Sequence, residues 1–159
     1  DEAVRAVGGN HLIFRLCWVY CSRGQNFLLT VQRLARERET LSVVKDQFGC
    51  PTWSRLIAEA TTLALRQVLA ATDANVFKGT YHLATGGSTN WHTFASHIVE
   101  MMPEAERCCR EVAAITTAEY PTPAKRPAYS VLDCGKLRRT FGIQLPDWED
   151  GLRLVLDKP

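Results

Sequence analysis

The sequence predicts an α/β fold, because short strand-like runs alternate with longer helix-like segments along its 159 residues. The first run, residues 11–20, is rich in apolar, aromatic and β-branched side chains, which is typical of a strand buried on both faces. Two shorter runs, residues 41–44 and 79–84, each follow a predicted helix. Because one buried strand cannot form a parallel sheet alone, we expect the rest of that sheet to lie before Asp1.

Apolar side chains at helical spacing predict three longer helices. The first begins after Asn26, a plausible N-cap, and continues to about Arg38. The second is capped by Thr52 or Ser54 and carries its apolar stripe as far as position 69. The third is capped by Ser88 or Thr89 and is broken by Pro103.

Shorter helical segments are expected near both ends of the chain. Asp133 is a candidate cap for one helix, and Trp148, Leu152 and Val155 form the last amphipathic turns. Residues 1–8 resemble the end of a helix closed by two glycines. A domain rarely begins in the last turns of a helix, so we expect this chain to be a piece of a longer protein.

Composition narrows the classes of function. A net charge of +2 with a pI of about 8.3 leaves no electrostatic footprint for nucleic acid or a membrane surface. The sequence has no apolar run long enough to span a bilayer and no signal-peptide pattern. The six cysteines lack the spacing of a zinc site, and adjacent Cys108 and Cys109 are interpreted as part of a helix face. A reduced, cytoplasmic protein is the expected context.

The segment from Tyr120 to Ser130 is basic and stiffened by proline. Three prolines within residues 121–127 hold the backbone near polyproline geometry and remove amide donors, so the segment fits neither a helix interior nor a central strand. It can hold Arg126 in a fixed place, which suits a planar, doubly charged oxyanion such as a phosphate. The alternative is a rigid linker between two elements.

Six motifs occur in a characteristic order, together with a similar closing sequence. They are Arg15-x-x-Trp-Val-Tyr20, Asn26-Phe27, Asp46-Gln-x-Gly-x-Pro-Thr52, Gly79-x-Tyr-His-Leu83, Tyr120-Pro-Thr-Pro-Ala-x-Arg-Pro-x-x-Ser130 and Leu132-Asp133-x-x-Lys136, with Phe141-Gly-Ile-x-Leu-Pro-x-Trp148 at the end. The whole chain therefore resembles the C-terminal half of dTDP-4-dehydrorhamnose reductases, members of the extended short-chain dehydrogenase/reductase superfamily.

The resemblance implies a fold and an activity. It implies the C-terminal part of an extended NAD(P)-binding Rossmann fold with a small α+β sugar-nucleotide-binding domain. Residues 1–20 and 53–85 would belong to the former, and residues 21–52 and 86–159 to the latter. Such enzymes use NADPH, or NADH in some cases, to reduce the 4-keto group of dTDP-4-dehydro-6-deoxy-L-mannose, giving dTDP-L-rhamnose.

The same resemblance implies what lies outside these residues. The glycine-rich phosphate loop and the catalytic Tyr-x-x-x-Lys pair would belong to a missing N-terminal Rossmann half, so this chain alone is expected to be inactive as a reductase. A homodimer is also implied. The resemblance also allows Mg²⁺ binding by full-length members of the family, although we identify no metal site in this sequence.

Site residues follow from the resemblance position by position. Cys17 and Trp18 would contact the cofactor, although Cys17 stands where the family usually has serine and Leu16 where it has threonine. Substrate-binding positions are Trp18, Asn26, Phe27, Gln47, Pro51, Thr52 and Arg126. Structural alternatives stay open: Trp18 as a core residue, Asn26 as a plain cap, Gln47, Pro51 and Thr52 as turn residues, and Arg15 in an ion pair rather than on a ligand.

Two other functional interpretations stay open. One is a non-catalytic relative, similar to the regulatory subunit of methionine adenosyltransferase, which keeps the fold and binds a partner enzyme. The other is a truncated product that does not fold alone and associates through the edge of its apolar strand. The intact proline segment with Arg126 favours the enzyme, because a pure binding subunit need not keep a clamp for a sugar nucleotide.

Overall fold

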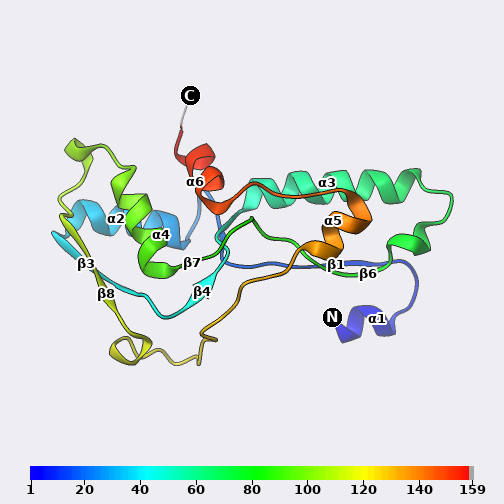
Figure 1. Ribbon diagram of the computed structural model, residues 1–159, viewed down its shortest axis with the longest axis horizontal. Coiled ribbons are helices and arrows are strands. Elements are labelled where there is room, and N and C mark those ends of the chain that lie inside the picture. The colour runs from blue at the N-terminus through cyan, green and yellow to red at the C-terminus, as the bar shows by residue number, and fades with distance from the viewer. Residues whose placement is uncertain (158–159) are drawn as a thin grey trace.

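The computed structural model describes residues 1–157 (Figure 1). Its strands form four two-stranded sheets, three parallel and one antiparallel. The parallel pairs are β1 (Leu12–Arg15) with β6 (Gly79–His82), β2 (Val19–Tyr20) with β5 (Thr52–Trp53), and β3 (Thr40–Val44) with β8 (Glu111–Ile115). The antiparallel pair is β4 (Phe48–Gly49) with β7 (Thr89–Asn90).

Helices occupy most of the remaining chain. The α-helices are α1 (Glu2–Ala6), α2 (Phe27–Glu37), α3 (Ser54–Ala70), α4 (Trp91–Glu100), α5 (Gly135–Phe141) and α6 (Trp148–Leu156). Short 3-10 helices are η1 (Ala74–Phe77), η2 (Glu104–Glu106) and η3 (Thr117–Glu119). Figure 1 shows α3 and α5 near β1 and β6 at one end of the long axis, and α2 and α4 near β3 and β8 at the other. None of the helices within residues 1–157 is long and apolar enough to cross a membrane.

The core consists of two main clusters that correspond to these two ends. The larger cluster joins α2, α4 and α6, with Phe94, Ile98 and Leu152 fully buried. The smaller one joins α3, β6 and α5 around Tyr81. Trp53 packs against both clusters and links them. The division of the chain into Rossmann and sugar-nucleotide parts stays a prediction. α5, which the division assigns to the sugar-nucleotide part, packs on α3 and β6, which it assigns to the Rossmann part.

The prediction of one strand from position 11 to 20, buried on both faces, is wrong. The chain leaves strand geometry at Trp18, whose φ of 39° lies in the left-handed region, and it continues as a separate strand. β1 pairs with β6, whereas β2 pairs with β5, so the two halves serve different sheets. Leu16 and Val19 are exposed, because neither half has neighbours on both sides within the described residues.

Of the four helix caps predicted from the sequence, one is confirmed; the N-cap of α5, for example, is Cys134 rather than Asp133. Asn26 is confirmed as the N-cap of α2, where its side chain accepts a hydrogen bond from the amide of Leu29. Neither Thr52 nor Ser54 caps α3, whose N-cap is Trp53, and α4 is capped by Asn90 rather than Ser88 or Thr89. Thr52 is unavailable because its buried hydroxyl already accepts from the amide of Thr85 and donates to the carbonyl of Cys50.

β8 was not predicted from the sequence, and the structure pairs it with β3 along its whole length. Cys108 and Cys109 lie in the extended connection that leads into this strand, so their interpretation as a helix face is wrong. Both of their amides donate to the carbonyl of Ala35 at the end of α2, each at 3.0 Å. These bonds hold the connection against the helix and align β8 with its partner.

Candidate functional site

The proline segment is anchored at both ends to residues 46–48. Three residues before its start, the amide of Thr117 donates to Oδ1 of Asp46 at 2.9 Å, and Nε2 of Gln47 donates to the Thr117 hydroxyl at 3.1 Å. At its end, the amide of Phe48 donates to Ala128, and the amide of Ser130 donates to Phe48, each at 2.8 Å. The intervening residues therefore form a loop that closes back on β4, visible as the irregular stretch below β4 in Figure 1.

A capping box fixes the start of this loop. Oε2 of Glu119 accepts from both the amide and the hydroxyl of Thr116, each at 2.7 Å. Hydrogen bonds from Thr117 lower the pKa of Asp46, and hydrogen bonds from Thr116 lower that of Glu119. Both carboxylates are thus stabilised in the charged form by the turn that they hold.

Arg126 lies in the middle of the anchored loop and is exposed, as are its neighbours from 118 to 129. None of the ion pairs found within residues 1–157 involves Arg126. The guanidinium is therefore available to an anion from solvent. The residues on either side, Lys125 and Pro127, add a second positive charge and a fixed backbone.

Trp18 lies in an aromatic group close to β4. Its indole stacks on Trp91, with ring centroids 3.6 Å apart and planes inclined by 11°. Phe27 lies 4.5 Å from the Trp91 ring, so the first residue of α2 joins the same group. Gly49 allows the indole its position, because a Cβ at that residue would lie 2.4 Å from Cε2 of Trp18.

Asn26, Pro51 and Thr52 are occupied by contacts within the protein. Besides capping α2, Asn26 donates from Nδ2 to the carbonyls of Cys21 and Arg23. The carbonyl of Pro51 accepts from the hydroxyl of Thr85 at 2.8 Å, and the Thr52 hydroxyl accepts from the Thr85 amide at 3.3 Å. Pro51 and Thr52 are buried, so they shape the backbone of the loop rather than present polar groups to solvent.

Cys17 is the buried centre that connects these parts. Its thiol donates to the carbonyl of Ser130 at 3.2 Å and accepts from the amide of Cys50, also at 3.2 Å. It therefore contacts both the end of the proline segment and the loop after β4. Hydrogen bonding from Cys17 lowers the pKa of Cys50 to about 6, whereas the same contact, together with burial, raises the pKa of Cys17.

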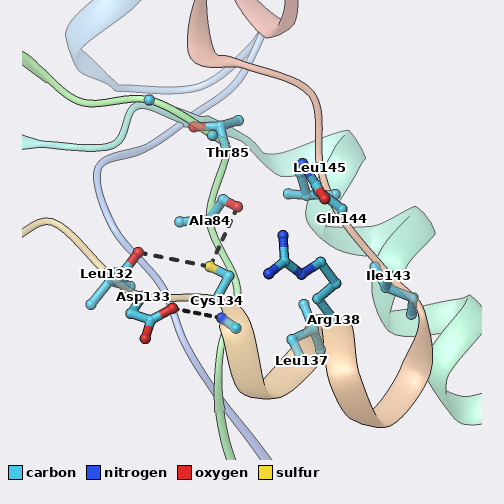
Figure 2. Close-up of a pocket in the computed structure, with 13 residues that line it drawn as sticks. Ala84, Thr85, Leu132, Asp133, Cys134, Leu137, Arg138, Ile143, Gln144 and Leu145 are labelled. Carbon is cyan, nitrogen blue, oxygen red and sulfur yellow. Dashed lines mark hydrogen bonds between the residues drawn. The ribbon is translucent and has the colours of Figure 1, made fainter.

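A cavity of about 220 Å³ lies next to this buried centre. Figure 2 shows it between the chain after β6, the α5 helix and residues 143–145, with Cys134 and Arg138 facing one another across it. Cys134 donates to the carbonyl of Ala84 at 3.6 Å and packs against Cys17 and Cys50. The cavity thus opens beside the thiols without containing a cluster of acids or histidines; no group of metal-ligating side chains is found among residues 1–157.

The structure answers the question of a partner for Arg15. Its Nε donates to Oδ2 of Asp1 at 2.8 Å, and the pair is partly exposed. Within the described residues, Arg15 therefore makes the structural ion pair that the sequence left open.

Several residues near the site were not predicted. The sequence identifies Trp91 only as part of the apolar stripe of a helix, yet its ring stacks on that of Trp18. Cys50 and Ser130 meet Cys17 only because of the pairing of β2 with β5 and the fold of the proline segment. Gly49 did offer a signal, because a glycine within a strand often marks a close approach.

Proteins of known structure share this arrangement. A dTDP-4-dehydrorhamnose reductase from Clostridium acetobutylicum aligns with a TM-score of 0.85 and 31% identity over 98% of this chain and 51% of that protein. A dTDP-4-dehydrorhamnose reductase from Bacillus anthracis, solved in complex with NADP, aligns with a TM-score of 0.78 and 32% identity over 97% and 50%. The fold class is therefore that of the Rossmann-type enzymes of the extended short-chain dehydrogenase/reductase superfamily, as predicted.

The sequence comparisons narrow this class. The pattern of the RmlD substrate binding domain matches residues 1–159, and the chain belongs to this family. A dTDP-4-dehydrorhamnose reductase from Burkholderia thailandensis is 46% identical over 161 residues, which cover 98% of this chain and 54% of that protein. The resemblance derived from the motifs is thereby confirmed. The chain spans about half the length of the curated relatives that it matches.

Proposed function

We propose that this chain is the substrate-binding half of an NAD(P)H-dependent reductase that converts dTDP-4-dehydro-6-deoxy-L-mannose to dTDP-L-rhamnose. One observation carries the proposal: the loop bearing Arg126 is tied at both ends to residues 46–48, beside Trp18. In this proposal a cation, a neutral amide and an aromatic ring act on one ligand. Those are the three kinds of group that a nucleotide diphosphate sugar requires.

Each group has a role in this proposal. Arg126 binds the diphosphate, and the unpaired amides at the start of α2, after Asn26 and Phe27, add a positive potential. Gln47, Pro51 and Thr52 border the thymine. The Gln47 side chain is buried and its Nε2 donates to Thr117, so its carbonyl oxygen and second N–H are what it can offer to the base. The indole of Trp18 packs against the apolar face of the hexose. Because Pro51 and Thr52 are buried, their contribution is to the shape of the loop.

The described residues fit only one end of a nicotinamide cofactor. Trp18 lies at the end of the chain's first parallel strand pair, where α/β folds bind their ligands, and Cys17 adjoins it. The Cys17 sulfur already contacts Ser130 and Cys50, so it offers bulk rather than a free polar group. NADPH would supply the hydride, and these two residues would position the nicotinamide ring beside the sugar.

The general acid would come from elsewhere. The sequence of this chain has no Tyr-x-x-x-Lys pair, so we propose that a separate Rossmann half provides it together with the phosphate loop. Exposed apolar residues near α1 and α3, including Val7 and Leu69, offer a surface for that half. A homodimer is part of the same proposal. The six cysteines are free, which supports a reducing compartment such as the cytoplasm.

The test is an assay of the full-length protein, including the N-terminal Rossmann half, with dTDP-4-dehydro-6-deoxy-L-mannose and NADPH. We expect loss of NADPH absorbance and formation of dTDP-L-rhamnose, with the corresponding UDP-sugar as a poor substrate. Trp18→Ala should lower kcat and raise KM, because it alters both the packing of the sugar and the geometry of hydride transfer. A full chain that lacks reductase activity but binds a methionine adenosyltransferase catalytic subunit would instead support the regulatory-subunit alternative.

A further inference from the structure

Two buried thiols lie opposite one another behind Trp18. β2 and β5 are parallel, with Val19 opposite Thr52 and Tyr20 opposite Trp53. Cys17 and Cys50 each lie two residues before this pairing, and the left-handed turn at Trp18 separates Cys17 from β2. The amide of Cys50 donates to Sγ of Cys17 at 3.2 Å, which shows that the two residues are in direct contact there.

The spacing of the two residues suits a covalent bond. A disulfide requires two sulfur atoms that can approach to about 2 Å, and the amide nitrogen of Cys50 already lies 3.2 Å from Sγ of Cys17. Cys17 and Cys50 are 5% and 1% exposed, and both side chains belong to one small buried cluster with Ala84. Both thiols are free in this structure.

A small oxidant has a route to this pair. Sγ of Cys50 donates to the carbonyl of Gly87 at 3.4 Å, and Gly87 lines the cavity of about 220 Å³ shown in Figure 2. Cys134, which also lines the cavity, packs against both thiols and is only half-buried. The wall of the cavity at Gly87 is therefore in direct contact with the Cys50 thiol. The contact with Cys17 lowers the pKa of Cys50 and raises that of Cys17, which favours Cys50 as the attacking thiolate.

We propose that Cys17 and Cys50 form an oxidisable pair that a hydroperoxide converts to a disulfide. The Cys50 thiolate attacks a peroxide oxygen, which breaks the O–O bond and gives a sulfenic acid and, after protonation, water. The Cys17 thiol then displaces the hydroxyl from the Cys50 sulfur, forming the S–S bond and a second water. In total, two thiols are oxidised and one hydrogen peroxide is reduced to two waters.

The bond would act on the candidate site. Forming it removes the hydrogen bond from Cys17 to Ser130 at the end of the proline segment. It also pulls Cys50 toward Cys17 and so shifts the adjacent Gly49, which lies against the Trp18 indole. Oxidation is therefore expected to disturb Trp18 and to lower activity; this second consequence rests on the proposed reductase function, whereas the disulfide itself does not.

Peptide mapping of the full-length protein tests the pair directly. The reduced protein is treated with a small excess of hydrogen peroxide, its remaining thiols are alkylated, and its peptides are analysed by mass spectrometry without reduction. We expect a linked peptide containing Cys17 and Cys50, lighter by two hydrogen atoms and released by dithiothreitol. Recovery of both cysteines in alkylated form, or a link between Cys50 and Cys134 instead, would overturn the proposal.

Variants give a matched comparison. Cys17→Ser and Cys50→Ser should each abolish the linked peptide, whereas Cys108→Ser, at an exposed thiol, should leave its yield unchanged. If either buried variant fails to fold, the mapping of the unaltered chain still decides the matter. The intrinsic tryptophan fluorescence of the unaltered chain should change on oxidation and return on reduction, and an unchanged spectrum despite a formed disulfide would overturn the link to Trp18.

Activity measurements separate this proposal from the reductase function. Each protein is compared with its own untreated activity, so basal differences do not matter. We expect peroxide to remove most of the activity of the unaltered full chain and dithiothreitol to restore it. Formation of the disulfide in a chain without reductase activity would contradict only the proposed function. An active reductase without the disulfide would contradict only the thiol pair.

Discussion

At the scale of single residues, Trp18 combines backbone strain with close packing. A bulky residue in the left-handed region costs about 1–2 kcal/mol, and its φ of 39° lies there. Stacking on Trp91 contributes about 0.5–1.5 kcal/mol beyond burial, so the two terms are of similar size. The conformation therefore depends on the surrounding contacts, above all on the space that Gly49 leaves for the ring.

Replacing Gly49 with alanine should displace the Trp18 indole. The new Cβ would lie 2.4 Å from Cε2 of the ring, and neither the stacked rings nor β4 can easily move apart. We expect a loss of about 1–3 kcal/mol in the free energy of unfolding, measured by urea titration, with an altered tryptophan spectrum.

Gly151→Ala is the matched control for this change. Its Cβ would meet nothing closer than 3.5 Å, and the residue lies inside α6, where alanine is favoured over glycine by about 1 kcal/mol. The control should therefore be neutral or stabilising. A Gly49→Ala protein as stable as the original would show that the indole is not held as described.

Arg126 gives the clearest residue-scale test of ligand binding. In the full-length reductase, Arg126→Ala should raise the KM for the sugar nucleotide more than it lowers kcat, because a phosphate contact is made equally in the ground and transition states. One charge-assisted contact of about 1.5–3 kcal/mol corresponds to a rise in KM of roughly tenfold or more. Lys78→Ala, at an exposed cation outside the proline segment, serves as control. Steady-state kinetics with an unchanged KM would remove Arg126 from the diphosphate.

At the scale of elements, sequence patterns predicted what local chemistry decides. Asn26 capped α2 as expected, and the apolar stripes of α4 and α6 formed where their spacing placed them. β8 was missed because Glu111-Val-Ala-Ala-Ile115 contains two alanines and forms a strand through its pairing with β3. The contact between Cys17 and Cys50 was missed for the same reason, since it depends on a register that no local signal reveals.

The candidate site divides along the same line. Of the motif positions, Trp18 packs against Gly49 of β4 and Gln47 anchors the loop that contains Arg126, but Trp91, which stacks on the Trp18 ring, followed no pattern beyond helical spacing. Contacts across elements decide whether a side chain at a motif position faces a ligand or the core. Thr52 illustrates this, because its hydroxyl is buried and bonded to Cys50.

The anchor of the proline segment should weaken in acid. Hydrogen bonds from Thr117 lower the pKa of Asp46 in the folded chain, so this contribution to stability is present above the ordinary pKa of about 3.9 and is lost as pH falls through the lower folded value. We expect faster exchange of the Thr117 amide proton in that range, followed by NMR.

A substitution should reproduce the acid effect at neutral pH. Asp46→Ala removes the acceptor of both the amide and the hydroxyl of Thr117, whereas Asp46→Asn keeps one acceptor oxygen. Exchange of the Thr117 amide should therefore be fastest in the alanine variant and intermediate in the asparagine variant. Equal protection in all three proteins would mean that Asp46 does not hold the loop.

At the scale of the whole molecule, the site lies between two core clusters that Trp53 links. One cluster supports α2 and the aromatic group around Trp18, and the other supports β6, α5 and the cavity. The anchored loop approaches from β8 and continues into α5, so it joins the two ends of the molecule (Figure 1). A ligand that bound Arg126 and Trp18 together would therefore couple both clusters and raise the melting temperature of the chain.

Differential scanning fluorimetry of residues 1–159 tests that coupling. At ten times its dissociation constant, dTDP should add about 1.4 kcal/mol to the free energy of unfolding, which is a shift of roughly 3–6 °C for a chain of this size. NADPH should give no shift, since the described residues offer it only Cys17 and Trp18. Arg126→Ala should reduce the dTDP shift. ADP has the same diphosphate with a different base, so it should give a smaller shift than dTDP. Equal shifts with dTDP and ADP would assign binding to the diphosphate alone and remove Gln47 from thymine recognition, whereas a shift with NADPH and none with dTDP would contradict the substrate-binding role.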